Sequence, residues 1–502
     1  MDPIEQLKAK LVELAHIKTA LALLSWDQEV NMPPKGAGKR AETMASIAGL
    51  LHDKLLSKEF EYNLNQAIEL KNKNLLDENN QALVREVERE FNLEKKLPAE
   101  FVREFAKLVS ESQIAWVAAR QKSDFKIFAP FLTKIVTAGR QMAGYLGYKE
   151  SPYDALLDLH EPGLTASETN LFLGNLKDFL VPFIRKIQNS KIKPDPGILT
   201  GKFPKEKQIE FNKEVVQKLG FDFEAGRVDQ STHPFAMGLH PQDIRLTTRY
   251  DETNVMESLS GIIHEAGHGL YDQGLPMENF GTPLGEAVSL GIHESQSRMW
   301  ENLVGKSREF WIYFYPKLQE KFPEPFAKIP LEDFYKAINT VQPSLIRVGA
   351  DEVTYNLHII LRFEIEKELI EGTIEVADLP GVWNQKIKQY FGLDVPNDAQ
   401  GCLQDLHWSM GSFGYFPTYC LGNLYSAQFF AAAQRDILDL DDQIRRGQFA
   451  ILRKWLLDHI HIHGKLYSAS DLSLKATGED LDSNFFINYL KNKYGEIYGI
   501  KE

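Results

Sequence analysis

The chain has 502 residues, of which 43% are hydrophobic and 25% are charged, as in an ordinary globular protein. Its formal net charge of −13 disfavours nucleic acid and an anionic membrane as main partners. No run of about 18 apolar residues exists to span a membrane, and two cysteines, Cys402 and Cys420, cannot form a disulfide framework. We therefore predict a cytoplasmic protein, built as roughly three domains or as one large architecture in two lobes.

Helical periodicity dominates the chain, with apolar residues at three- and four-residue spacing and Glu, Lys and Gln on the opposite face. The predicted helical segments, in chain order, cover residues 4–24, 40–71, 76–122, 126–147, 166–190, 206–219, 255–272, 284–304, 307–321, 345–371, 421–445 and 447–460. This pattern predicts a mainly α protein with one small β-sheet.

Strand signals are scarce, and the strongest is "DIRLTTRY" at Asp243–Tyr250, where apolar and charged residues alternate. As an edge strand beside a cleft it could pair with an extended peptide. Two segments read as loops: Asn189–Lys205, rich in Pro, Gly and Lys, and Ser409–Asn423, rich in Gly and aromatic residues.

The segment "SGIIHEAGHGLYDQG", Ser260–Gly274, contains the motif H-E-x-x-H within an apolar helical pattern. Residues four apart on a helix lie one above the other, so His264 and His268 can direct both imidazoles at one metal ion. Glu265 lies about 100° around the helix, where it can reach a water at the metal but not easily ligate it. The alternative, two unpaired imidazoles buried beside a carboxylate, would be costly.

A catalytic metal of this type needs a third protein ligand and one open position. The next helical segment, near 284–304, offers Glu286, His293, Glu294 and Glu301. Glu286 and Glu294 are eight residues apart and could share one helix face. Spacing alone does not choose between them, and we expect the other to orient a ligand histidine.

The chain resembles the HEXXH metallocarboxypeptidases of the carboxypeptidase Taq family, over nearly its whole length. The resemblance rests on ordered motifs beside "HEAGH": "LLSWDQEVNMPPKGAGKR" (Leu23–Arg40), "HPF" (His233–Phe235), "DIRLT" (Asp243–Thr247), "HESQSR" (His293–Arg298), "IRVGAD" (Ile346–Asp351) and "GCLQDLHW" (Gly401–Trp408).

The resemblance implies one peptidase domain over residues 1–502, saddle-like and two-lobed around a deep groove, and a homodimer. It implies a metal-dependent carboxypeptidase that releases single residues from peptide C-termini with broad specificity. It also selects Glu294 as the third ligand, and zinc, with cobalt or manganese as alternatives, as the ion.

An exopeptidase must bind a terminal carboxylate, which suits the planar fork of an arginine. Arg347 is the first candidate and Arg245 the second, although most arginines are solvated or form structural ion pairs. His233, held extended by the following proline, could donate to the oxyanion; otherwise it is a buried histidine bonded to a carbonyl.

Two tyrosines in the Gly/aromatic segment are further candidates. A phenol of Tyr415 or Tyr419 could reach the oxyanion, and the resemblance favours Tyr419; the alternative is aromatic packing. Asp405 could accept a hydrogen bond from a ligand histidine, or serve packing.

The sequence thus predicts a peptidase in which Glu265 acts as general base on a metal-activated water. The alternative enzyme is a helical oligopeptidase or dipeptidyl carboxypeptidase with the same H-E-x-x-H plus glutamate set. A binding scaffold without chemistry is disfavoured by the complete set of four residues.

Overall fold

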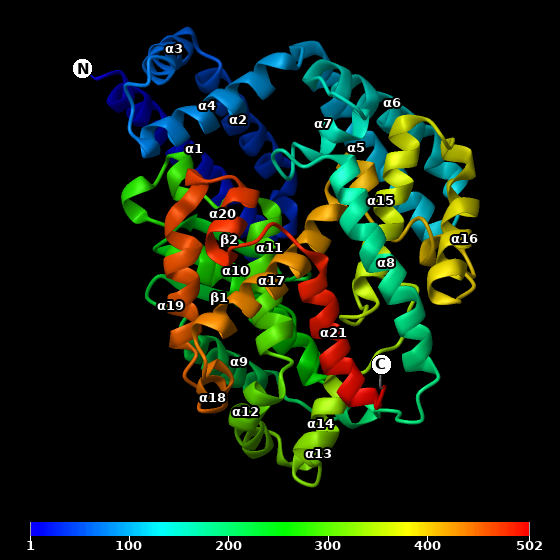
Figure 1. The fold of residues 1–502 in the computed structure, drawn as a ribbon. Helices are drawn as coiled ribbons and strands as arrows, with labels where there is room; N and C mark the ends of the chain where they lie inside the picture. Colours follow the sequence, from blue (N-terminus) through cyan, green and yellow to red (C-terminus); the bar gives the residue numbers. More distant parts are fainter. Residues whose placement is uncertain (1, 501–502) are drawn as a thin grey trace.

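The computed structural model describes residues 2–500 and is mainly helical with one small sheet, as predicted (Figure 1). The N-terminal helices lie together at the upper left of Figure 1 and have their own apolar core. They are α1 (Pro3–Val30), α2 (Ala37–Leu55), α3 (Lys58–Asn72) and α4 (Glu78–Lys96).

A second group of helices lies on the right of Figure 1 and joins segments far apart in the sequence. These helices are α5 (Ala99–Lys122), α6 (Ala129–Leu146), α7 (Pro152–Leu157), α8 (Ala166–Gln188), α15 (Tyr355–Glu371) and α16 (Leu379–Phe391).

The remaining helices lie at the centre, left and bottom of Figure 1, and the sheet lies among them. These helices are α9 (Lys205–Leu219), α10 (Val255–Gly274), α11 (Leu290–Arg298), α12 (Arg308–Lys321), α13 (Pro323–Phe326), α14 (Leu331–Ile338), α17 (Phe416–Asp436), α18 (Leu440–Arg445), α19 (Ala450–His459), α20 (Ala469–Thr477) and α21 (Ser483–Tyr498). One continuous core runs through this group and the second.

Local chemistry divides several segments that we predicted as single helices. The segment 40–71 is two helices, because the Ser57 side chain caps α3 by accepting from the Phe60 N–H at 3.2 Å. The segment 76–122 is broken before Pro98, which disfavours helical backbone at the preceding residue.

Other predicted boundaries were also wrong. The segment 345–371 is helical only from Tyr355, and 421–445 is divided into α17 and α18. Much of the predicted loop 409–423 is helical, because α17 begins at Phe416. Helices α7, α13, α14, α16, α20 and α21 were not predicted at all.

The sheet has the order β1 (Gly226–Gln230), β3 (Asp243–Thr248), β2 (Ala236–His240). Strand β3 pairs with β1 in parallel and with β2 antiparallel. The predicted strand is therefore confirmed, but its prediction as an edge strand was wrong, because both its edges are occupied. Its buried residues Ile244 and Leu246 pack against α10, so the sheet supports the helix that carries H-E-x-x-H.

Candidate metal centre and active site

Helix α10 carries the two histidines toward the same point. Its N-terminus is capped by Asn254, whose side chain accepts from the Met256 N–H at 3.0 Å. One face of the helix buries apolar side chains, including Leu259 and Ile262, against the sheet and core. From another face His264 and His268 project side by side, with ring centroids 5.0 Å apart.

Helix α11 approaches α10 and α17 unusually closely, because glycines lie at both contacts. A Cβ at Gly267 would lie 2.5 Å from the Ser297 Cα, and a Cβ at Gly422 would lie 2.3 Å from the Glu294 Cγ. Only residues without a side chain allow this approach. As a result, Glu294 is held between α17 and the two histidines of α10.

The three side chains form a compact donor set. The Glu294 Oε2 lies 3.3 Å from the His268 Nε2 and 3.7 Å from the His264 Nε2. In a tetrahedral zinc site with ligand bonds of about 2.0–2.1 Å, neighbouring ligand atoms are about 3.3 Å apart. Among residues 2–500, this is the one group of His, Cys, Asp and Glu side chains that converges in this way. The geometry and the donor types therefore fit a zinc-type ion.

The other carboxylates of the predicted segment lie elsewhere. The segment 284–304 becomes α-helical only at Leu290, so Glu286 precedes the helix, and it pairs with Lys465 at 2.6 Å. Our expectation that Glu286 would orient a ligand histidine if it were not the third ligand was wrong. That contact is made by Glu301, whose Oε2 lies 2.8 Å from the His264 Nδ1.

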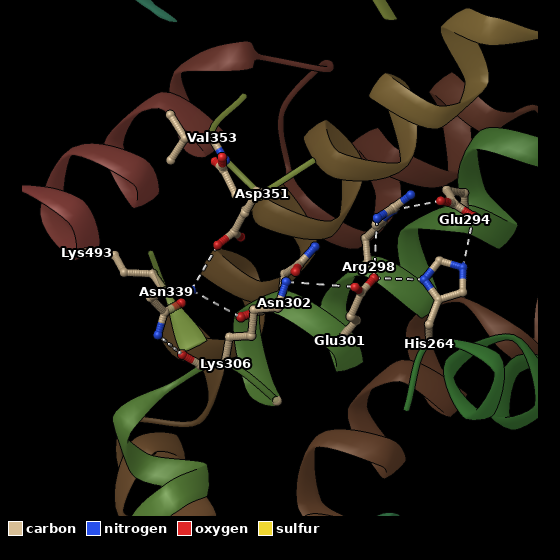
Figure 2. A network of polar contacts seen from close by, with 12 residues as sticks. His264, Glu294, Arg298, Glu301, Asn302, Lys306, Asn339, Asp351, Val353 and Lys493 are labelled. Carbon is tan, nitrogen blue, oxygen red and sulfur yellow. Dashed lines mark hydrogen bonds and ion pairs between the residues drawn. The ribbon is translucent and has the colours of Figure 1, made fainter. Parts of the chain in front are cut away.

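Figure 2 shows how Arg298 joins these carboxylates. Its Nε donates to the Glu294 Oε1 at 2.7 Å, and its Nη1 donates to the Glu301 Oε2 at 3.3 Å. Because Arg298 occupies Oε1, only Oε2 of Glu294 faces the histidines. Glu301 lies on a π-helical turn, Met299–Val304, that continues α11; such turns are frequent at functional sites.

The electrostatics of the cluster favour a bound cation. Burial alone would raise the pKa of Glu294, but Arg298 and the histidines outweigh it and hold that pKa well below its usual range. Burial lowers the pKa of His268 to about 4, so its imidazole is neutral, as a metal ligand must be. Burial raises the pKa of Glu265 to about 7, which allows it to accept and release a proton near neutral pH.

The two histidines differ in the contacts of their Nδ1 atoms. The His264 Nδ1 is bound to Glu301, whereas within the described chain the buried His268 Nδ1 has no hydrogen-bond partner. The His268 ring instead stacks on His293, with centroids 4.4 Å apart. His293 in turn lies 3.0 Å from Asp272 through its Nε2.

Arg347 lies in a second buried cluster. Its Nε donates to the Asp405 Oδ1 at 3.0 Å, and the other oxygen of Asp405 accepts from the Arg362 Nε at 2.7 Å. The prediction that Asp405 accepts from a ligand histidine was therefore wrong, because both its oxygens bind arginines. With two guanidinium groups around one carboxylate, this cluster carries an excess positive charge.

Tyr355 connects the two clusters. Its hydroxyl accepts from the Arg347 Nη1 at 3.2 Å, and the guanidinium of Arg298 lies over its ring at 4.6 Å from the centroid. Tyr419 lies beside the same site, with its ring centroid 5.2 Å from the Arg347 guanidinium carbon and 5.3 Å from the Tyr415 ring. The carboxylate of Glu294 and the guanidinium of Arg347 are thus joined through Arg298 and a single tyrosine.

The remaining predicted residues have different surroundings. Arg245 donates to both oxygens of Asp243, at 3.0 and 3.1 Å, and lies 4.3 Å from the centre of the Trp26 ring. Because Asp243 already pairs with the guanidinium of Arg245, these contacts favour a structural role over substrate binding. His233 is exposed in the connection between β1 and β2, rather than a buried histidine, and its role stays a prediction.

Sequence reasoning missed Arg298 and Tyr355 and weighed Glu301 only as a metal ligand. A weak signal existed for Arg298, which follows Glu294 at the four-residue spacing of a helical ion pair. Nothing in the sequence joins Tyr355 to Arg298, because they come from different helices.

A helical fold with an H-E-x-x-H helix and a glutamate from the next helix defines a metallopeptidase. Comparison with known proteins identifies the family: the chain matches the carboxypeptidase Taq (M32) metallopeptidase model over residues 6–494 and belongs to that family. It is therefore a metallocarboxypeptidase, and the predicted resemblance is confirmed.

Relatives align over nearly their full length. The chain is 40% identical over 490 residues to Carboxypeptidase 1 of Bacillus subtilis, covering 97% of each chain. It is 40% identical over 498 residues to Thermostable carboxypeptidase 1 of Thermus thermophilus, again covering 97% of each. The structure of Pyrococcus furiosus carboxypeptidase superposes with a TM-score of 0.95 at 38% identity, covering 98% of this chain and 99% of that one.

Among residues 2–500, no helix is long and apolar enough to cross a membrane.

Proposed function

We propose that this metallocarboxypeptidase removes single residues from the C-termini of peptides with broad specificity, using zinc held by His264, His268 and Glu294. The observation that carries the proposal is a pair of buried clusters with opposite excess charge. The α10–α11 cluster has three carboxylates, Glu265, Glu294 and Glu301, for two cationic side chains, Arg298 and Lys306, the latter 3.8 Å from Glu301. The Asp405 cluster has two arginines for one carboxylate.

Unbalanced buried charge is costly unless a ligand compensates it. A divalent cation compensates the first cluster, and a peptide's terminal carboxylate compensates the second. Because one tyrosine separates the clusters, a peptide anchored at Arg347 would present a bond close to its end at the metal. This arrangement suits an exopeptidase better than an oligopeptidase that cuts internal bonds.

A bound divalent ion would supply Lewis acidity and lower the pKa of water to about 7. Glu265 takes the proton from the attacking water and later delivers it to the leaving amine. The hydroxyl of Tyr419 and the imidazole of His233 are the candidate donors to the developing oxyanion.

Substrate recognition centres on Arg347. Its Nε and Nη1 are used by Asp405 and Tyr355, while Nη2 binds no group among residues 2–500 and is available to a substrate carboxylate. Tyr415, beside Tyr419, is a further candidate for substrate binding. Arg245 is the second candidate for the arginine that binds the substrate carboxylate.

We further propose a two-lobed single domain over residues 1–502 around a deep groove, a homodimer and a cytoplasmic location, with cobalt or manganese as alternative ions.

The test is digestion of matched peptides with a free and an amidated C-terminus, followed by mass spectrometry. The proposal expects a ladder of single-residue losses from the free peptide and little cleavage of the amidated one. Loss of dipeptides or internal cuts would instead support the dipeptidyl carboxypeptidase or oligopeptidase alternative. Metal analysis of the purified chain identifies the ion.

A further inference from the structure

Glu161 is a buried glutamate that belongs to neither charged cluster. It lies in the turn between α7 and α8, and 3% of its surface is exposed. Both of its oxygens bind the beginning of α11: Oε1 accepts from the Ser289 hydroxyl at 2.7 Å, and Oε2 accepts from the Gly291 N–H at 2.9 Å. A residue from one group of helices thus binds the helix that carries Glu294.

These contacts complete the cap of α11. Ser289 is the N-cap residue, and its hydroxyl oxygen accepts from the Ile292 N–H at 3.1 Å. Because that hydroxyl donates to Glu161, its lone pairs are turned toward the helix. Glu161 also takes the Gly291 N–H directly and places a carboxylate at the positive end of the helix.

The cap matters because Glu294 is only the fifth residue of α11. The helix begins at Leu290, directly after Ser289, whose backbone is extended, and continues beyond Arg298 through the π-helical turn to Val304. The position of a first helical turn depends on its cap and on its packing. Glu294 lies three residues after Gly291, so a shift of the first turn would move its carboxylate relative to His264 and His268.

The turn that carries Glu161 is itself held firmly. The Asp158 carboxylate accepts from the Gly163 N–H at 2.7 Å and pairs with Arg89 of α4 at 2.8 Å. The ring of His160 packs on Tyr415, with centroids 5.2 Å apart. The turn therefore joins three parts of the molecule: α4, the start of α11 and the start of α17.

We propose that Glu161 is a positioning residue for the metal centre: it fixes the first turn of α11 and thereby holds Glu294 in place for the ion. The proposal rests on the proposed function, which assigns the ion to Glu294 and the two histidines. It assigns a role to a residue that lies outside every motif singled out from the sequence.

The experiment measures zinc affinity of the full-length, metal-free chain by competition with a chromophoric chelator, using zinc alone as the probe. Glu161→Ala should weaken zinc binding by about tenfold or more, the range found for groups that support metal ligands. Glu161→Gln should weaken it less, because an amide oxygen can still accept one of the two hydrogen bonds. Thermal unfolding of each metal-free variant is measured in parallel.

Two further variants make the measurement specific. Glu366→Gln is the matched control, because Glu366 is also fully buried and also accepts from a backbone N–H, that of Gly414 at 2.9 Å. It should leave zinc affinity unchanged, whatever it does to the unfolding temperature. Glu301→Gln is the positive control, because Glu301 contacts His264 directly and its loss should weaken zinc binding.

The proposal is overturned if both Glu161 variants bind zinc as tightly as the wild type while Glu301→Gln binds it more weakly. A lower unfolding temperature alone would then show that Glu161 serves only general stability. If Glu161→Ala does not fold, the milder Glu161→Gln decides. A wild-type chain that binds no zinc rejects the proposed function as well, so the two failures are distinguishable.

Discussion

The cluster around Glu294 and the cluster around Asp405 are both buried networks of arginine and carboxylate, yet they have opposite excess charge. In the first, three carboxylates lie near Arg298, which pairs with Glu294 and Glu301, and near Lys306, which pairs with Glu301; in the second, two arginines pair with one carboxylate. A purely structural network gains most when its charges balance. We therefore propose that a ligand compensates the imbalance in each cluster: a cation in the first and an anion in the second.

In the proposed mechanism, Glu265 belongs to the first cluster as an acid–base group rather than as a metal ligand. Glu265→Gln should lower kcat by about a thousandfold while the metal content stays at the wild-type level, because the amide cannot take up a proton. Peptide hydrolysis and metal analysis of the same sample check this. An active Gln variant would remove Glu265 from the mechanism.

The second cluster should lose its anion preference without Arg347. Arg347→Ala should lower kcat/KM for peptides with a free C-terminus roughly 100-fold, about 3 kcal/mol, mainly through KM. Arg245→Ala tests the second candidate anchor and should cost less, because its guanidinium is already paired with Asp243. Equal losses on free and amidated peptides would contradict the role of Arg347 as carboxylate anchor.

Another buried acid, Glu366, lies next to the arginine cluster and accepts from Tyr153 and Trp408 at 2.7 and 2.8 Å. Burial raises its pKa from 4.5 to about 7, so the fold favours its protonated form. Its contribution to stability is present below pH 4.5 and is lost as the pH rises to 7.

Glu366→Gln removes this dependence. Between pH 4.5 and 7 the free energy of unfolding of the wild type should therefore fall by about 3 kcal/mol relative to that of the variant. Chemical denaturation at several pH values measures the difference. Parallel curves for the two proteins would show that Glu366 titrates normally in the fold.

Within the first cluster, the two proposed ligands His264 and His268 should differ in how strongly neighbouring groups support their zinc binding. Glu301→Gln should weaken zinc binding roughly 10- to 100-fold, because the amide orients the His264 ring less strongly. Asp272→Asn is the matched comparison, since Asp272 reaches His268 only through the stacked His293. A larger loss in the Asp272 variant would reverse the assigned importance of the two contacts.

Removing the Tyr355 hydroxyl, which connects the two clusters, should have the smallest effect on activity. Tyr355→Phe removes the hydroxyl that accepts from Arg347 but keeps the ring under Arg298. We expect a loss of about 1 kcal/mol, roughly fivefold in kcat/KM for free peptides, and no change in zinc affinity. A loss of zinc binding would show that the hydroxyl supports the metal cluster instead.

Sequence patterns predicted the fold class, the helix that carries H-E-x-x-H and a strand at 243–250, which the structure has at 243–248. They failed at helix boundaries such as Ser57 and Pro98, where one cap or one proline interrupts a continuing apolar pattern. They also left β1 and β2 unassigned, because these short strands have little alternation and exist through their pairing with β3.

The sequence by itself determined the positions of His264, Glu265 and His268 relative to one another, because helical geometry fixes contacts between residues one turn apart. Only the tertiary structure decided that Glu294 rather than Glu286 meets them, that Asp405 binds arginines, and that Glu161 caps α11. These contacts join residues that are distant in the chain, and their partners are selected by how closely helices pack, as at Gly267 and Gly422.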